Sequence, residues 1–314
     1  MLDHERIRLL MGHDGNSTSD TAIATAAALF PGSRAAVLHV SKSFADWGVG
    51  SRVWMLDRDL YDVAVLDAAQ RQLDAAVEAA RTAGLDDALG ELLTTGGSVW
   101  RTMLAAAAEF EPDVVVVGKH AHGSRGSVRL GSVAHGLVAR CPFPVLVVHP
   151  RDDGTSPLQP GGPVVIAYDG SEGARRMVDI VARLLPGAPT RIVSVWEPIP
   201  VWVVAPPMGP ATFHADFDTE LQQLTQERAD EGVARAQAAG LDAEAIASEA
   251  PDGAWRAIIR IASERSARVL CIGARSRGRV AAALLGGVAH AVVAESPVPV
   301  LIAHPDPVSD ADGT

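Results

Sequence analysis

The chain has 314 residues, of which 48% are hydrophobic, and its formal net charge at pH 7 is −11. Domains of about 150 residues are common, so this length predicts two domains rather than one large core. The negative net charge argues against binding to nucleic acids or anionic membranes, because both require a broad basic surface.

The sequence also lacks the features of secreted and membrane proteins. Its start, MLDHERIRLL, is charged and has no apolar core of a signal peptide. No apolar run reaches the roughly 18 to 20 residues that span a bilayer. The two cysteines, Cys141 and Cys271, form neither a disulfide framework nor a CxxC metal motif. We therefore expect a cytoplasmic protein with reduced thiols.

Short β-branched runs alternate with longer amphipathic or alanine-rich segments in the first half of the chain. Strands are predicted at Arg6–Gly12, Ala35–Val40, Ala88–Thr94, Asp113–Gly118 and Pro144–His149. Helices are predicted between them, at Ser19–Phe30, Asp62–Ala83, Ser98–Phe110 and Ser132–Arg140. This alternation is typical of βαβ units and a parallel sheet. The runs VVVV and VLVV do not alternate in polarity, so these strands should be buried on both faces.

The second half of the chain repeats the first. Asp14 matches Asp169 and Gly118 matches Gly273, an offset of 155 residues in both cases, and residues 98–150 match 253–305 without a gap. The corresponding strands read PVVIAYD, TRIVSVW, ARVLCIG and PVPVLIAH, with a third strand near 244–249. We predict two copies of one domain at 1–150 and 163–307, a linker rich in Pro, Gly and charge at 151–162, and a tail at 308–314.

Residues suited to a ligand follow the predicted strands. Parallel sheets bind ligands outside the carboxyl ends of their strands, where the strand order reverses. Asp14 and Asp169 follow the first strand of each copy, beside a glycine, and a carboxylate in such a turn can accept hydrogen bonds from ribose hydroxyls. Gly131 and Gly286 precede the last helix of each copy, where outward-facing backbone N–H groups favour an anion.

The spacing of these glycines resembles the G-x2-G-x9-G-[S/T] loop of the ATP-binding branch of the universal stress protein family. The positions with this spacing are Gly118, Ala121 and Gly131-Ser132 in the first copy, and Gly273, Ser276 and Gly286-Gly287 in the second. The resemblance implies an α/β fold of two tandem Rossmann-like domains of the adenine nucleotide alpha hydrolase-like type. Each would have a five-stranded parallel sheet in the order 3-2-1-4-5, with helices on both faces. It also implies ATP, with or without Mg²⁺, as the ligand.

Carried over by position, the resemblance implies a binding set in each copy. Asp14 and Asp169 would meet the ribose, and Val40 and Val195 the adenine through their backbones. The first set is Gly12, His13, Asp14, Val40, Gly118, His120, Ala121, Gly131, Ser132 and Val133. The second set is Ala167, Tyr168, Asp169, Val195, Gly273, Arg275, Ser276, Gly286, Gly287 and Val288.

The sequence departs from the family motif at three positions. Ala121 and Ser276 stand where the family has its second glycine, and a Cβ there takes room beside the phosphates. Gly287 replaces the hydroxyl residue of the motif. The sequence therefore leaves open whether one copy, both copies or neither copy binds ATP.

His120 and His122 form an HxH pair, which invites a metal interpretation. A closed site needs about four ligands, and the second copy has Arg275 and Arg277 at the matching positions. Hydrogen-bond donors beside phosphates explain both copies better, so we expect no metal site.

The expected function is that of a stress-response or regulatory protein rather than an enzyme. The G-x-G-x-x-G motif of dehydrogenases is missing after the first strand, and the P-loop motif and the HxGH signature of adenylyl transferases are absent. A weak ATPase and a scaffold without nucleotide are the alternatives. The family resemblance also implies pairing of the final strands, Pro144–His149 with Pro299–His304, as an internal pseudo-dimer that covers two sheet edges; a homodimer of the whole chain is a further option.

Overall fold

The structure is a computed structural model that describes residues 6–42, 58–119, 130–149, 158–159, 161–198, 212–274 and 286–304. The chain divides into two compact units, Met1–Pro157 and Leu158–Thr314, and the division falls within the predicted linker at 151–162. Most of that linker and the predicted tail at 308–314 lie outside the described residues. Each unit contributes five strands and four helices to the described part of the chain.

The strands of the first unit are parallel and follow the order β3-β2-β1-β4-β5. They are β1 (Arg8–Gly12), β2 (Arg34–Lys42), β3 (Leu89–Thr95), β4 (Val114–Gly118) and β5 (Val145–Val148). The helices are α1 (Ser17–Leu29), α2 (Arg58–Thr82), α3 (Val99–Phe110) and α4 (Ser132–Arg140). The α/β fold and the strand order implied by the family resemblance are confirmed.

The second unit repeats this arrangement in the order β8-β7-β6-β9-β10. Its strands are β6 (Val164–Ala167), β7 (Pro189–Trp196), β8 (Asp242–Glu249), β9 (Val269–Gly273) and β10 (Val300–Ala303). Its helices are α5 (Glu172–Leu184), α6 (Thr212–Ala238), α7 (Ala254–Glu264) and α8 (Gly287–Glu295). The third strand, predicted only near 244–249, begins at Asp242.

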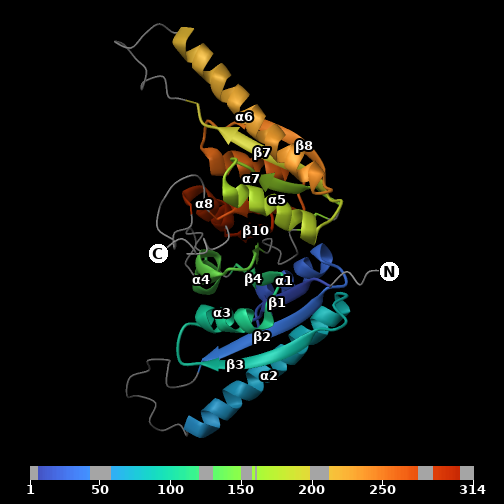
Figure 1. Cartoon of the computed structure of the whole chain (residues 1–314). Helices are drawn as coiled ribbons and strands as arrows, with labels where there is room; N and C mark the ends of the chain where they lie inside the picture. The colour runs from blue at the N-terminus through green and yellow to red at the C-terminus, as the bar shows by residue number, and fades with distance from the viewer. Residues whose placement is uncertain are drawn as a thin grey trace, which may run out of the picture. The chain divides into compact units, whose positions relative to one another are not determined.

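Two helices cover each face of the sheet in the first unit. Right-handed crossovers place α1 and α2, which lead outward from β1 to β3, on one face, and α3 and α4 on the other. The contacts agree, because α1 packs against α2 and α3 packs against α4, and α2 lies along β2 and β3 (Figure 1). Val114–Val117 of β4 are consequently buried on both faces, as their sequence predicts.

The longest helices, α2 and α6, are rich in charged residues. Both α2 and α6 carry acidic and basic side chains throughout, and α2 turns Leu73, Ala76 and Ala80 toward the sheet. In the described part of the chain, no helix combines the length and the apolar character needed to cross a membrane.

Candidate functional site

The carboxyl ends of β1 and β4 form a crevice in the first unit. These strands are parallel neighbours, with Met11 opposite Val116. The chain continues from β1 to β2 on one side and from β4 to β5 on the other, so the connecting segments diverge and leave space between them. The resulting cavity measures about 550 Å³. Cavities of about 300–1,000 Å³ are typical for small organic ligands.

Most of the residues predicted for the first site line this cavity. They are Gly12, His13, Asp14, Val40, Gly118, Gly131, Ser132 and Val133. His120 and Ala121 lie outside the described residues. The sequence therefore predicted a set of positions, distant along the chain, that the fold brings to one place.

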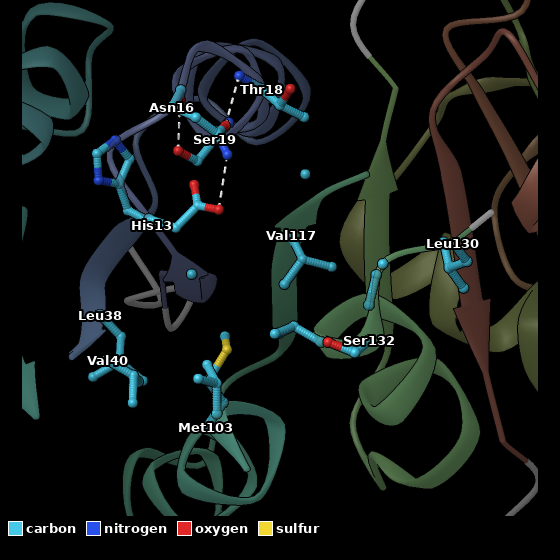
Figure 2. A pocket seen from close by; sticks show the side chains of 17 residues that line it. His13, Asn16, Thr18, Ser19, Leu38, Val40, Met103, Val117, Leu130 and Ser132 are labelled. Carbon is cyan, nitrogen blue, oxygen red and sulfur yellow. Dashed lines mark hydrogen bonds between the residues drawn. The ribbon is translucent and has the colours of Figure 1, made fainter. Parts of the chain in front are cut away.

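The sequence analysis missed the apolar wall and the first turn of α1. The missed lining residues are Asn16, Thr18, Ser19, Leu38, Val99, Met103, Val117, Leu130 and Ala134. Figure 2 shows Leu38, Val40 and Met103 around the same space. Periodicity could have found several of them, because Leu38 shares the strand face of Val40, and Val99 and Met103 share one helix face.

Asp14 is exposed and is held in place by Asn16. The Asn16 Nδ2 group donates to Asp14 Oδ2 at 2.8 Å. The Asn16 Oδ1 atom accepts from the backbone N–H groups of Thr18 and Ser19 at 2.9 and 3.0 Å and thereby caps α1 (Figure 2). Because the cap fixes Asn16, it also orients the Asp14 carboxylate, whose Oδ1 atom has no hydrogen-bond partner among the described residues.

His13 lines the cavity, but both of its ring nitrogens are bound within the protein. Nδ1 accepts the Gly15 N–H at 3.3 Å, so Nε2 carries the proton and donates to Asp20 Oδ1 at 2.9 Å. Burial lowers the pKa of the neighbouring His39; the proximity of His13 acts in the same direction, and the charge of Asp14 opposes both. His13 can therefore contact a ligand through its ring, but neither ring nitrogen is free to act as a general base.

Helix α4 begins at the cavity with unoccupied backbone donors. Its N-cap residue is Gly131, which has no side chain to bind them. In the described part of the chain, the backbone N–H groups of Ser132, Val133 and Ala134 meet no acceptor, and all three residues line the cavity. Such N–H groups at a helix N-terminus bind anions, phosphates among them.

Gly118 and Gly273 have a packing role in addition to their place in the motif. A Cβ on Gly118 would lie 2.9 Å from the backbone oxygen of Thr18, and a Cβ on Gly273 would lie 2.9 Å from that of Gly173. The first turn of α1 or α5 therefore approaches the strand so closely that only glycine fits at its end.

The second unit has a smaller cavity at the matching place, of about 150 Å³. The predicted residues that line it are Ala167, Tyr168, Asp169, Val195, Gly273, Gly286 and Val288. Gly287, the first residue of α8, is exposed and is not among the lining residues, and Arg275 and Ser276 lie outside the described part. The missed lining residues are Ser171, Ala174, Val193, Ser194, Arg228, Ala254, Ile258, Ile272 and Ala289.

Tyr168 links the second cavity to two helices. Its hydroxyl donates to Glu231 Oε1 of α6 at 2.9 Å, and Arg175 of α5 pairs with the same carboxylate at 2.8 Å. Burial and, to a lesser extent, the Glu231 carboxylate together raise the pKa of Tyr168 to about 12, although Arg175 acts in the opposite direction. The hydroxyl therefore stays protonated and fixes α6 to the end of β6.

We expect the free energy of unfolding of the Tyr168→Phe variant to be about 1 kcal/mol lower than that of wild type at neutral pH, because one part-buried hydrogen bond is lost. Above pH 10, unfolded wild type loses the phenol proton and the folded state keeps it, so the stability of wild type falls as the pH rises from 10 to about 12. The variant should lack this part of the decline. Urea titrations at several pH values measure both, and equal slopes in the two proteins would contradict the assignment. Cys141, whose pKa burial raises to about 11, contributes equally to both.

The structure does not test the expectation that the chain has no metal site at His120 and His122. Among the described residues, no three His, Cys, Asp or Glu side chains gather closely enough to hold a metal ion. His120 and His122 lie outside those residues, so the expectation that they bind no metal stays a prediction.

Comparisons with known proteins agree with the division into two similar units and with the fold of each unit. The family model described as the universal stress protein family matches residues 6–149 and again 162–304. A universal stress protein of Mycolicibacterium smegmatis is 28% identical over 316 residues, covering 95% of this chain and 97% of the relative. One from Mycobacterium tuberculosis is 29% identical over 206 residues, which are 62% of each chain, so this chain spans less than two thirds of that relative.

Two solved structures share the fold over nearly the whole chain. A universal stress protein from Archaeoglobus fulgidus gives a TM-score of 0.60 at 18% identity, covering 97% of this chain and 99% of its own. A putative universal stress protein from Pseudomonas aeruginosa gives 0.54 at 17% identity, covering 96% and 95%. At these identities the likeness concerns the fold, whereas the two family matches concern the sequence itself. The chain therefore belongs to the universal stress protein family and carries two copies of the family's domain in tandem.

Proposed function

We propose that the first unit binds an adenine nucleotide, ATP with or without Mg²⁺. The observation that carries this proposal is the cavity of about 550 Å³ at the ends of β1 and β4. It combines an apolar wall, a carboxylate and a helix N-terminus with unoccupied donors, which correspond in chemistry to a base, a ribose and a phosphate.

The residues of this cavity fit each part of such a ligand. Leu38, Val40 and Met103 offer apolar surface for a planar base. Asp14, oriented by Asn16, can accept hydrogen bonds from ribose hydroxyls. The N–H groups at the start of α4 meet no acceptor among the described residues and can bind phosphate oxygens through the backbone.

The proposed role is regulatory, in a stress response, with nucleotide occupancy changing shape or partner choice. Dedicated catalysis has little support in the described residues, because the one histidine of the first cavity has both ring nitrogens engaged. Slow ATP hydrolysis is the nearest alternative. The cytoplasmic location and the lack of a nucleic-acid partner stay predictions from composition and charge.

Nucleotide content and binding test the proposal. We expect denatured protein to release an adenine nucleotide on chromatography, and calorimetry on nucleotide-free protein to show ATP binding. Gly131→Val, which places bulk beside the helix N-terminus, should weaken this binding at least about tenfold by blocking hydrogen bonds to the phosphates. Ser263→Ala on the surface of α7 should not.

Two other outcomes would change the proposal. Protein without bound nucleotide and without ATP binding would favour a scaffold that has lost the ligand. Phosphate release that Gly131→Val abolishes would favour a weak ATPase.

We also propose an internal pseudo-dimer in which the final strands of the two units pair. Within its own unit, β5 pairs with β4, and β10 pairs with β9, so each final strand has a second edge to cover. Small-angle scattering that fits only two separated units would contradict this pairing. The same data against concentration would detect a homodimer of the whole chain.

A further inference from the structure

Among the described residues, the second cavity has a cationic side chain in its lining and the first cavity does not. Arg228 of α6 lines the second cavity, whereas the described residues around the first cavity include no lysine or arginine. Counted back from the glycine that follows each helix, Arg228 matches Gln72, since each stands twelve residues before Gly84 or Gly240. The Gln72 side chain lies against the turn after β1, only 2.6 Å from where a Cβ on Gly15 would be. A side chain at this helix position thus reaches the ligand edge of the sheet.

Arg228 is half-buried and has no ion pair or hydrogen bond with any described residue. Its neighbours differ in this respect. Arg235 of the same helix pairs with Asp179 through Nε at 3.0 Å, and Arg175 pairs with Glu231. An arginine left without a carboxylate, in a unit where the adjacent arginines are paired, is suited to an anion from outside the chain.

The second cavity also contains a carboxylate and free backbone donors. Asp169 Oδ1 accepts the Ser171 N–H at 2.9 Å, and no ion pair within 4.0 Å joins its carboxylate to Arg228. Val288 and Ala289 line the cavity at the start of α8, and in the described part their N–H groups meet no acceptor. A ligand that satisfies these groups has hydroxyls for the carboxylate and an anionic group for the guanidinium.

The second cavity has less than a third of the volume of the first, about 150 Å³ against about 550 Å³. It therefore encloses a smaller ligand, or a smaller part of one, than the first cavity does. Tyr168 and Ile272 stand where the first unit has the smaller His13 and Val117, and Arg228 enters from α6.

We propose that the second unit binds a compact phosphate ester of a sugar, of nucleoside monophosphate size or smaller, with Arg228 as the counter-ion of its phosphate. The two units of the chain then select different ligands, a triphosphate in the first and a monophosphate in the second. This inference rests on the proposed nucleotide-binding function and adds a ligand class and a specificity residue to it.

Calorimetry with AMP, ATP and adenosine tests the inference on the full chain. The Gly131→Val background weakens the first site, so the remaining binding reports on the second. In this background AMP should bind with one site per chain and about tenfold more tightly than ATP. Adding Arg228→Gln should weaken AMP at least about tenfold, because a charge-assisted hydrogen bond is lost, and should leave adenosine unchanged. Arg265→Gln, an exposed arginine of the same unit, is the matched control and should change nothing.

Three results would overturn the inference: AMP affinity unchanged by Arg228→Gln, ATP bound as tightly as AMP in the Gly131→Val background, or no AMP binding by that variant while its circular dichroism is native. Loss of adenosine binding in Arg228→Gln would show a structural role for the arginine instead, and would also count against the inference. Failure of the first proposal looks different. Wild type would then bind ATP no more tightly than the Gly131→Val variant does, while the single AMP site and its dependence on Arg228 would persist.

Discussion

The Gly118→Ala variant is expected to lose about 2–3 kcal/mol of unfolding free energy in the first unit, because overpacking at a rigid contact carries a cost of this size. The added Cβ would lie 2.9 Å from the Thr18 backbone oxygen and 3.0 Å from its carbonyl carbon. Backbone atoms of the capped first turn of α1 cannot yield as a flexible side chain can. Chemical denaturation followed by far-ultraviolet circular dichroism measures the change.

Gly97→Ala is the matched control for this variant. Its added Cβ would meet only Thr95 Oγ1, at 3.8 Å, and its φ is not positive. We therefore expect a change within about 0.5 kcal/mol, as for ordinary surface substitutions. If Gly118→Ala is as stable as Gly97→Ala, the glycine at the end of β4 serves the ligand alone and the packing argument fails.

The Asp14→Ala variant is expected to bind ATP about ten to one hundred times more weakly in the first unit. A hydrogen bond to a charged group contributes about 1.5–3 kcal/mol, and tenfold in affinity corresponds to about 1.4 kcal/mol. The Asp14 carboxylate is exposed and accepts from the Asn16 side chain at 2.8 Å. Its removal therefore deletes a ligand contact with little loss of folding stability.

Two comparisons test whether the loss of affinity in Asp14→Ala comes from a contact with the ribose. Asp67→Ala removes an exposed carboxylate from α2, away from the cavity, and should leave the affinity unchanged. Titration with 2′-deoxy-ATP and 3′-deoxy-ATP tests the ribose contact itself. Asp14→Ala should reduce the affinity for ATP more than that for the analogue lacking the hydroxyl it binds. Equal losses for all three ligands would mean that Asp14 acts through charge or local structure rather than through a ribose hydroxyl.

Much of the fold follows from local and periodic features of the sequence. The unbroken run Val114–Val117 indicated a strand buried on both faces, and β4 is buried in this way because helices cover both sides of the sheet. The repeat placed Asp169 and Gly273 by analogy with Asp14 and Gly118. The predicted ends of the elements were less accurate. Helix α2 begins at Arg58, whereas the sequence predicted a start at Asp62, because the helical pattern before Asp62 is weak.

The site was predicted as a set of backbone positions, and its side-chain connections were not. Asn16 was overlooked although an Asn before Ser-Thr-Ser is a recognisable helix cap. Its bond to Asp14 depends on the turn between β1 and α1, which no spacing rule gives. His13 was predicted to contact the ligand, and it does line the cavity, yet its nitrogens are bound to Asp20 and Gly15.

By itself, the sequence determined the two copies, the alternation of strands and helices, and the glycines and carboxylates at strand ends, because each of these is written in neighbouring or regularly spaced residues. Only the tertiary structure decided what the two copies do not share. The volumes of about 550 and 150 Å³ depend on how closely the helices approach each sheet. The arginine of the second cavity comes from Arg228, remote in the sequence from Asp169, and only packing of α6 against β7 and β8 brings the two to one cavity.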